Sequence, residues 1–465
     1  MMTFLSRSTP ESVGIPSRIL TETLEELKKL TALNSLMVLR HGHVCAEGWW
    51  KPYSPEIPHM LFSLSKSFTS SAIGILQGER GLDLQTPLYT FFPEAEKSIT
   101  DPKMRAVTLR HLLTMSSGHA SCAMAFMEKD PDGDYVKSFL SSKLTYLPGE
   151  RFVYNSGGTY MLAAVVRKLT GENVREYLIP RLFDPLGIVP GIWECCPRGT
   201  NLGGWGFNLK TEDIAKFGQL LLDGGRWNGK QLIPAEYLQA ATAKQIDNSM
   251  NDMPDWKLGY GYQFWQNRYG FRADGACGQY ALVLPEYDMT IAVTAGLANM
   301  QNVMTIFWEH LIPGIRKETD TLPEDPEALQ ALRSALASLS IPLAQGDTTR
   351  RGESAVWNCG RNDAGIRSVS ISFGKDDCTL LFTTEKGEEK IHAGFGFNCD
   401  NLIQFRDSLP RRSAASAAWS AEDLLEIHVC NYETPFRDVY QINFTSQKVT
   451  RSSNTNFLHP PLGLS

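Results

Sequence analysis

The order of extended and helical segments constrains the fold of this chain more than any other feature. Apolar and β-branched runs on both sides of a His-Gly turn near residue 41 predict a β-hairpin. From about residue 63 to residue 238, most segments carry apolar residues at helical spacing. The expected strands are residues 36–40, 44–49, 260–266, 278–286 and 289–296. Strands on both sides of a helical middle favour one antiparallel sheet flanked by helices, with an inserted helical lobe and a site between the lobes.

A charged, proline-rich stretch, "KETDTLPEDPE", marks a boundary after this unit. It leads into an amphipathic helix whose leucines fall on one face. Beyond Gly346 the pattern changes to short strands separated by turn residues, which predicts a separate antiparallel β domain. We therefore expect an α+β protein. It would have a two-lobed domain over residues 1–320, a linker and helix over 321–345, and a C-terminal β-barrel or sandwich domain over 346–465.

Composition excludes several classes of protein. The 465 residues are 42% hydrophobic and 21% charged, which is typical of a soluble globular protein. The net charge is −6 and no Lys/Arg-rich block is present, so the sequence gives no sign of a positively charged surface that would bind nucleic acid. No run of 18 apolar residues and no secretion signal are readable, so we expect no membrane partner and a cytoplasmic location.

Cysteine usage bears on metals and cofactors. The nine cysteines are scattered and contain no C-x-x-C pair, which favours free thiols over a disulfide framework or a zinc site. No phosphate-binding loop and no HExxH motif are present either. We expect no cofactor, no metal and a small-molecule substrate, and a homo-oligomer stays open.

Ser63 and Lys66 stand three residues apart at the head of an apolar segment, "SLSKSFTSSAIGILQG". On a helix, residues at this spacing lie on one face. A serine hydroxyl becomes a nucleophile when a base takes its proton, and a lysine becomes a base when burial or a nearby cation lowers its pKa. The alternative is a capped helix with a solvated lysine. Ser372 and Lys375 share the spacing, but their Gly-Lys-Asp-Asp context predicts a turn.

Tyr154 precedes another apolar helix in "FVYNSGGTYMLAAVVRKLTG". A tyrosine beside a lysine cation can lose its proton at lower pH and act as a general base. The alternative for Tyr154 alone is a half-buried aromatic residue with a bonded hydroxyl group. Ser63, Lys66 and Tyr154 together form the candidate catalytic set.

Four stretches in order resemble the serine β-lactamase-related hydrolases. They begin "LFSLSKSFTSS", "VTLRHLLTMSSGH", "FVYNSGG" and "GGWGFNLKTEDIAKFG", and the likeness covers about residues 10–315. This family includes class C β-lactamases, family VIII carboxylesterases, D-aminopeptidases and nylon-oligomer hydrolases. The resemblance implies a β-lactamase/transpeptidase-like fold with the S-x-x-K helix between two lobes. It also implies Ser63 as nucleophile, with Lys66 and Tyr154 as the acid/base pair.

Two motifs depart from the family pattern. The usual Tyr-x-Asn is Tyr154-Asn155-Ser156 here, and Ser156 is carried over as an orienting residue. The third motif, Lys-Thr-Gly or His-x-Gly in the family, aligns with Ala273-Asp274-Gly275. The missing cation argues against penicillin-like substrates, whereas Gly275 still allows a close approach of substrate. The resemblance implies the N–H groups of Ser63 and Ala276 as oxyanion donors.

The remaining candidates concern the pocket and a conventional triad. Candidate pocket residues are Trp205, Arg272 and Asp274. His111 and His119 would suit a catalytic triad, but no G-x-S-x-G elbow exists in the chain. The resemblance instead places His111 in a structural helix.

These patterns predict a serine hydrolase that cleaves small esters through an acyl-Ser63 intermediate. The alternatives, in order, are an amidase or peptidase of the same mechanism, a β-lactamase, and a non-catalytic binding module. Retention of Ser63, Lys66 and Tyr154 together argues against the last. The C-terminal domain could cover the cleft, mediate oligomerisation or buttress the fold.

Overall fold

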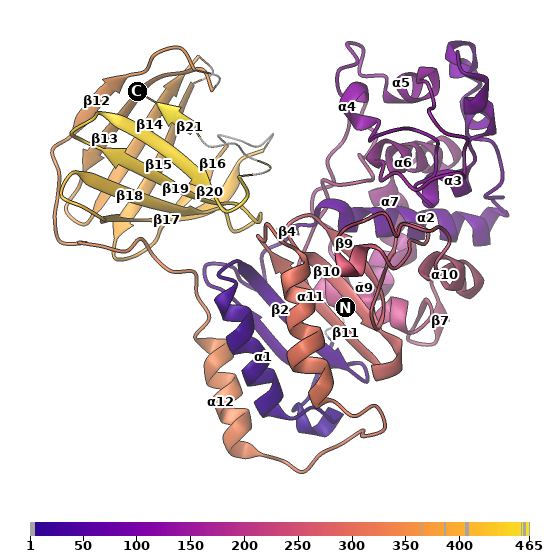
Figure 1. Cartoon of the computed structure of the whole chain (residues 1–465), viewed down its shortest axis with the longest axis horizontal. Helices are drawn as coiled ribbons and strands as arrows, with labels where there is room; N and C mark the ends of the chain where they lie inside the picture. Colours follow the sequence, from indigo (N-terminus) through magenta and orange to yellow (C-terminus); the bar gives the residue numbers. More distant parts are fainter. Residues whose placement is uncertain are drawn as a thin grey trace.

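The structure is a computed structural model that describes residues 5–362, 364–385, 387–404, 409–456, 458 and 462–464. A mixed sheet with helices on both faces, a helical lobe and a C-terminal β-sheet make up the molecule (Figure 1). This arrangement confirms the expected α+β class with a C-terminal β domain.

The first sheet is formed by strands from the beginning and from the end of the chain segment that precedes the boundary stretch. Within the described residues it has seven strands in the order β1-β3-β2-β11-β10-β9-β8. The strands are β1 (Ser6–Arg7), β2 (Leu33–Arg40), β3 (His43–Trp49), β8 (Trp265–Asn267), β9 (Gly270–Gly275), β10 (Gln279–Leu284) and β11 (Met289–Ala295). Strand β2 pairs with β11 at the centre, from Met289 opposite Arg40 onward. The predicted hairpin of β2 and β3 is confirmed. The strand expected over 260–266 is shorter, because Gln263 has a φ of +66° that interrupts extended structure.

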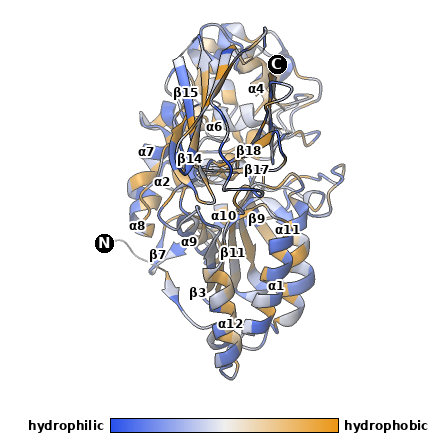
Figure 2. Ribbon diagram, turned by 90° about the vertical axis from the view of Figure 1, so that its left-hand side faces the viewer, coloured by the Kyte–Doolittle hydropathy of each residue, from blue (hydrophilic) through white to orange (hydrophobic). Residues whose placement is uncertain are grey.

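Helices cover both faces of this sheet. On one face lie α1 (Ser17–Lys29), α11 (Gln301–Ile306) and α12 (Pro326–Ala337), with a π-helical turn, Phe307–Leu311, after α11. On the other face lies α9 (Thr211–Leu222), against β2, β10 and β11. In Figure 2, hydrophobic and hydrophilic residues alternate along α1 and α12, as in helices with one face on a core.

The helical lobe is built around α2 (Ser65–Arg80), which ends at Gly81 with a left-handed φ of +65°. Every residue of α2 from Ser65 to Leu76 is buried. Around it lie α6 (Ser156–Thr170), α7 (Val174–Leu178) and α10 (Ala235–Thr242). The other helices of the lobe are α3 (Leu109–Leu113), α4 (Met124–Met127), α5 (Tyr135–Ser141) and α8 (Asp184–Leu186).

Small polar side chains allow α2 to be buried on all sides. Ser67 and Ser70 donate to the carbonyl oxygens of Gln263 and Tyr262, both at close range (2.8 and 2.6 Å), and Thr69 donates to that of Gly203 at 2.8 Å. Because buried hydroxyl groups need partners, these bonds fix the loops around residues 203 and 263 on the helix.

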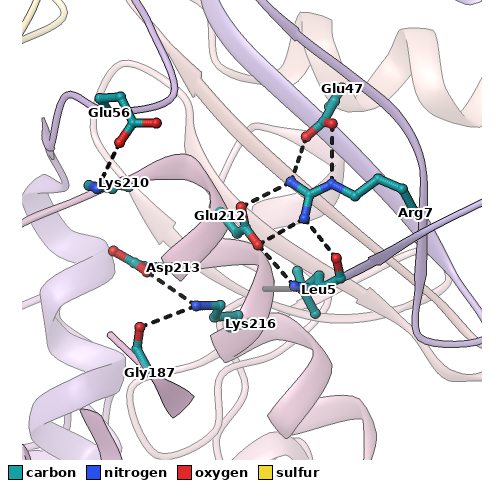
Figure 3. A network of polar contacts seen from close by, with 9 residues as sticks. All are labelled: Leu5, Arg7, Glu47, Glu56, Gly187, Lys210, Glu212, Asp213 and Lys216. Carbon is teal, nitrogen blue, oxygen red and sulfur yellow. Dashed lines mark hydrogen bonds and ion pairs between the residues drawn. The ribbon is translucent and has the colours of Figure 1, made fainter. Parts of the chain in front are cut away.

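A polar network fastens the first strand to the sheet and to α9 (Figure 3). The Arg7 guanidinium forms ion pairs with Glu47 of β3 and Glu212 of α9, both at 2.9 Å. Nearby, Lys216 and Asp213 of α9 are buried 3.9 Å apart, and burial raises the pKa of Asp213 to about 6.

The C-terminal domain is one curved sheet, a half-barrel, which in the described residues has ten strands. They are β12 (Ala355–Asn358), β13 (Ile366–Phe373), β14 (Asp377–Thr384), β15 (Gly387–Phe395), β16 (Cys399–Ile403), β17 (Arg411–Trp419), β18 (Leu424–Cys430), β19 (Arg437–Asn443), β20 (Lys448–Ser453) and β21 (Leu462–Leu464). Strand β15 pairs in parallel with β17, which the expected antiparallel pattern did not include. Side chains that point inward from alternate positions of the strands in this sheet form a core separate from that of the first domain.

The loop between β18 and β19, residues 431–436, joins this domain to the first one. The Met60 N–H donates to the Glu433 carbonyl oxygen at 2.9 Å, and the Tyr53 hydroxyl donates to that of Thr434 at 3.0 Å. Next to this loop, the Arg437 guanidinium donates to the carbonyl oxygen of Leu33 at 2.8 Å.

Candidate active site

Ser63, Lys66 and Tyr154 lie together at the head of α2. Ser63 belongs to a 3₁₀ turn, Phe62–Leu64, and Lys66 to the first turn of α2. Lys66 Nζ is 2.9 Å from Ser63 Oγ and donates to the carbonyl oxygen of Gly204 at 2.8 Å. The same nitrogen lies 4.8 Å from the centroid of the Tyr154 ring. The three groups therefore share one polar centre at the junction of sheet and lobe.

Burial determines the protonation of the lysine. The Lys66 side chain is only 1% exposed, and burial lowers the pKa of its amine to about 7. The thiol of Cys122 and the Asp274 carboxylate act in the opposite direction but do not reverse the shift. At neutral pH a large fraction of this amine is therefore unprotonated and able to accept a proton.

Tyr154 has the opposite character. Burial, assisted by the charge of Asp274, raises the pKa of Tyr154 above its ordinary value, although a hydrogen bond with Ser63 lowers it. The ring stacks on Trp265, with centroids 5.6 Å apart. The sequence predicted a lowered pKa for Tyr154, and the structure gives a raised one. Burial would remove the phenolate from water, and the neighbouring lysine, which readily loses its proton, does not supply a lasting positive charge. The hydroxyl group keeps its proton and is suited to donate it.

Ser156 is close to the lysine but does not bind it in the described part of the chain. The bonds of the amine go to Ser63 and Gly204. A Cβ placed on Gly204 would lie 3.4 Å from both Lys66 Nζ and Ser156 Cβ, so Ser156 borders the same space. The neighbouring Asn155 instead caps α6, because its Oδ1 accepts from the N–H of Gly157 at 3.0 Å.

The end of β9 approaches the backbone of Ser63 closely. A Cβ placed on Gly275 would lie 2.0 Å from the Leu61 carbonyl oxygen and 3.1 Å from the Ser63 nitrogen, so glycine is required for this approach. Gln279 binds the backbone just after Gly275, because its Nε2 donates to the Ala276 carbonyl oxygen at 3.0 Å. Neither the Ser63 N–H nor the Ala276 N–H meets an acceptor within the described chain, so both are available to bind an oxyanion.

Arg272 and Asp274 form a buried ion pair of 2.9 Å behind the site. The Arg272 side chain has no exposed surface and lies 4.3 Å from the Trp256 ring centroid. Asp274 is nearer to the reacting groups, since its charge affects the pKa of both Lys66 and Tyr154. Trp205 lines a cavity between the two domains.

Both candidate histidines have other partners. His111 closes a capping box with Thr108 at the start of α3. His119 is buried and bonds to Ser117 and Ser142 at 3.0 and 2.8 Å. In the described ranges, no three His, Cys, Asp or Glu side chains are grouped so that they could hold a metal ion.

The structure adds residues that the sequence reasoning missed. The Gly204 carbonyl holds the Lys66 amine, and the GGWG stretch was the only signal for it. Phe62 has a left-handed φ of +48° immediately before Ser63, a strained conformation of the kind found at functional sites. Phe436 of the C-terminal domain contacts Phe62, with ring centroids 6.2 Å apart, and no sequence pattern connects these two positions.

Comparison with known proteins agrees with this geometry. A family model described as Beta-lactamase matches residues 34–302. The 6-aminohexanoate-dimer hydrolase of Paenarthrobacter ureafaciens is 24% identical in an alignment of 316 residues, which covers 63% of this chain and 79% of that protein. The lovastatin esterase of Penicillium rubens is 28% identical in an alignment of 149 residues, which covers 29% of this chain and 36% of that protein.

A solved structure extends the likeness of the fold to the C-terminal domain. The octameric penicillin-binding protein homologue from Pyrococcus abyssi matches with a TM-score of 0.51 and 17% identity, over 96% of this chain and 99% of that one. Among the described residues, no helix is both long and apolar enough to cross a membrane. Because the family model spans more than half of the chain, this protein belongs to the β-lactamase family and is a serine hydrolase.

Proposed function

We propose that this protein hydrolyses small esters through an acyl-Ser63 intermediate. One observation carries the proposal: the buried Lys66 amine lies 2.9 Å from Ser63 Oγ, and burial brings its pKa to about 7. A neutral amine in hydrogen-bond reach of a hydroxyl group is the arrangement that activates a serine.

Acylation begins when Ser63 Oγ attacks the carbonyl carbon of the ester and its proton passes to Lys66 Nζ. The N–H groups of Ser63 and Ala276 stabilise the oxyanion of the tetrahedral intermediate. As the intermediate collapses, the bond to the alcohol oxygen breaks, and Tyr154 donates its proton to that oxygen. The Lys66 ammonium then returns a proton to Tyr154, which leaves the acyl group on Ser63 and an uncharged alcohol.

Deacylation repeats this sequence with water as the nucleophile. Water attacks the acyl carbonyl carbon and gives one proton to Lys66. The bond to Ser63 Oγ then breaks, and the serine recovers its proton from the acid/base pair. The products are a carboxylic acid and the starting enzyme.

The second candidate is hydrolysis of small amides by the same residues. Two observations favour it: Tyr154 keeps the proton that an amine leaving group needs, and a relative is named a 6-aminohexanoate-dimer hydrolase. A penicillin-like substrate is disfavoured, because Ala273 stands where the family usually carries a lysine or histidine.

The test is a comparison of substrates with purified protein. We expect p-nitrophenyl acetate and butyrate to be hydrolysed with burst kinetics, faster than D-alanyl anilides and a chromogenic cephalosporin. Ser63→Ala should abolish the turnover. Full activity in that variant would exclude Ser63 as nucleophile, and faster cleavage of the anilides would favour the amidase.

A further inference from the structure

A cavity of about 300 Å³ lies where the C-terminal half-barrel meets the hydrolase domain. Its first-domain wall includes Met60, Phe62 and Trp205. Its C-terminal wall includes Val429, Phe436 and Tyr440, from β18, the adjoining loop and β19. Both domains are needed to enclose this space, and it is distinct from the polar centre around Lys66.

The cavity is adjacent to the candidate active site on two sides. Phe62 directly precedes Ser63 in the chain, and Trp205 directly follows Gly204, whose carbonyl oxygen accepts from Lys66. The hydrogen bond from the Met60 N–H to the Glu433 carbonyl oxygen fixes the loop of residues 431–436 next to this part of the first domain. Two residues of the cavity wall are therefore chain neighbours of the groups that form the candidate active site.

The character of the walls indicates what would bind. Most lining side chains are aliphatic or aromatic. The charged lining residues among those described are Arg411 and Glu194, which form an ion pair of 3.8 Å, and Asp438, which is buried. The volume is about twice that of the ~150 Å³ apolar cavities that bind benzene, which leaves room for a bicyclic aromatic group or a medium-length hydrocarbon chain.

We propose that this interdomain cavity binds an apolar group of the substrate, so that the C-terminal domain forms part of the substrate site and sets its chain-length preference. This inference rests on the proposed ester hydrolysis at Ser63. The apolar group belongs either to the acyl part or to the alcohol part of the ester, and separate substrate series distinguish the two. Burial of each methylene group can raise kcat/KM up to about fourfold.

The experiment measures kcat/KM on two series. The acyl series is p-nitrophenyl acetate, butyrate and octanoate, and the alcohol series is ethyl, butyl and octyl acetate. We expect kcat/KM to rise with chain length in one series for the wild-type protein. Val429→Trp fills the cavity from the C-terminal side, and in that series it should lower the ratio of long-chain to short-chain kcat/KM at least tenfold.

The matched control is Val356→Trp, the same change on β12 at a side chain that is 72% exposed and does not line the cavity. This control should keep the wild-type ratio within twofold. Phe436→Ala enlarges the cavity and should shift the preference toward longer chains, which decides the matter if Val429→Trp does not fold.

The outcomes separate this inference from the proposed function. If the wild-type protein cleaves no ester of either series and Ser63 is not labelled by a fluorophosphonate, the proposed function fails. If short esters are cleaved at Ser63 but neither series depends on chain length, the cavity proposal alone is overturned. An unchanged ratio in folded Val429→Trp and Phe436→Ala would overturn it as well.

Discussion

At the scale of residues, burial assigns different roles to two neighbouring groups. Burial lowers the pKa of Lys66 to about 7 and raises that of Tyr154, because in each case it disfavours the charged form. The lysine thus becomes a base, and the tyrosine remains an acid. Ser63 links the two groups, because its hydroxyl group lies 2.9 Å from Lys66 Nζ and forms a hydrogen bond with the Tyr154 phenol.

The first prediction concerns pH. The pKa of Lys66 is lowered to about 7 in the fold, so the amine is neutral above that pH and protonated below it. We expect kcat/KM for p-nitrophenyl acetate to rise as pH increases through about 7 and to fall tenfold per pH unit well below it. A rate profile that stays flat between pH 5 and 8, measured with a stable protein, would contradict Lys66 as the base.

The second prediction concerns the phenol. Tyr154→Phe removes the proton donor but keeps the ring against Trp265, so kcat should fall by about 10²–10⁴-fold while KM changes little. Tyr269→Phe makes the same change on a ring that packs on Tyr287 and Trp308, and it should leave kcat unaltered. A rise in KM with an unchanged kcat in Tyr154→Phe would show a binding role instead.

At the scale of elements, the end of β9 and the head of α2 form the reacting surface together. The Ala276 carbonyl oxygen accepts from Gln279 Nε2, and the left-handed Phe62 turns the chain into α2. Serine and threonine side chains on the next turns fix α2 to the loops around it. Because these contacts come from separate segments, a small shift of one element should separate the nucleophile from the oxyanion donors.

The third prediction tests this close approach. Gly275→Ala would place a methyl group 2.0 Å from the Leu61 carbonyl oxygen, which forces β9 away from Ser63. A displacement of about 1 Å can cost about 100-fold in rate, and we expect a loss of kcat of that order. Gly218→Ala in α9, whose added methyl group finds its nearest atom at an ordinary 3.4 Å, is the control and should retain activity. Equal activities of the two variants would refute the argument.

Local patterns predicted most elements but not their exact junctions. The hairpin of β2 and β3, the strands β10 and β11, and helix α12 follow from periodicity, because each buries one face or lies wholly in a core. The S-x-x-K spacing predicted that Ser63 and Lys66 lie together, although Ser63 belongs to a 3₁₀ turn before α2 and not to the helix itself. The pKa direction of Tyr154 could not be read from its neighbours in sequence, since burial comes from tertiary packing.

At the scale of the whole molecule, the C-terminal half-barrel is a neighbour of the reacting groups rather than a remote appendage. Its β18–β19 loop bonds to Met60, and Phe436 packs on Phe62, next to Ser63. Sequence periodicity predicted the strands of this domain but could not indicate which of its loops would face the hydrolase domain. That contact depends on long-range packing between residues more than 350 positions apart.

The fourth prediction concerns the junction of the domains. Arg437 donates to the carbonyl oxygens of Thr31 and Leu33, at 2.7 and 2.8 Å, at the start of β2. Arg437→Ala should reduce the free energy of unfolding by about 2 kcal/mol, because hydrogen bonds from a charged donor are lost. Arg367→Ala removes a 65%-exposed side chain from a surface pair and should cost less than about 1 kcal/mol. Equal denaturation midpoints for both variants would show that Arg437 does not hold the domains together.

The most direct test of the account is to trap the intermediate on the intact protein. A reaction with p-nitrophenyl butyrate, quenched in acid during the burst and analysed by peptide mass spectrometry, should place one butyryl group on the peptide that contains Ser63. The same experiment with Ser63→Ala should give no adduct and no burst. Turnover without an adduct on Ser63 in the wild-type protein, or an adduct that maps to another residue, would contradict the central claim.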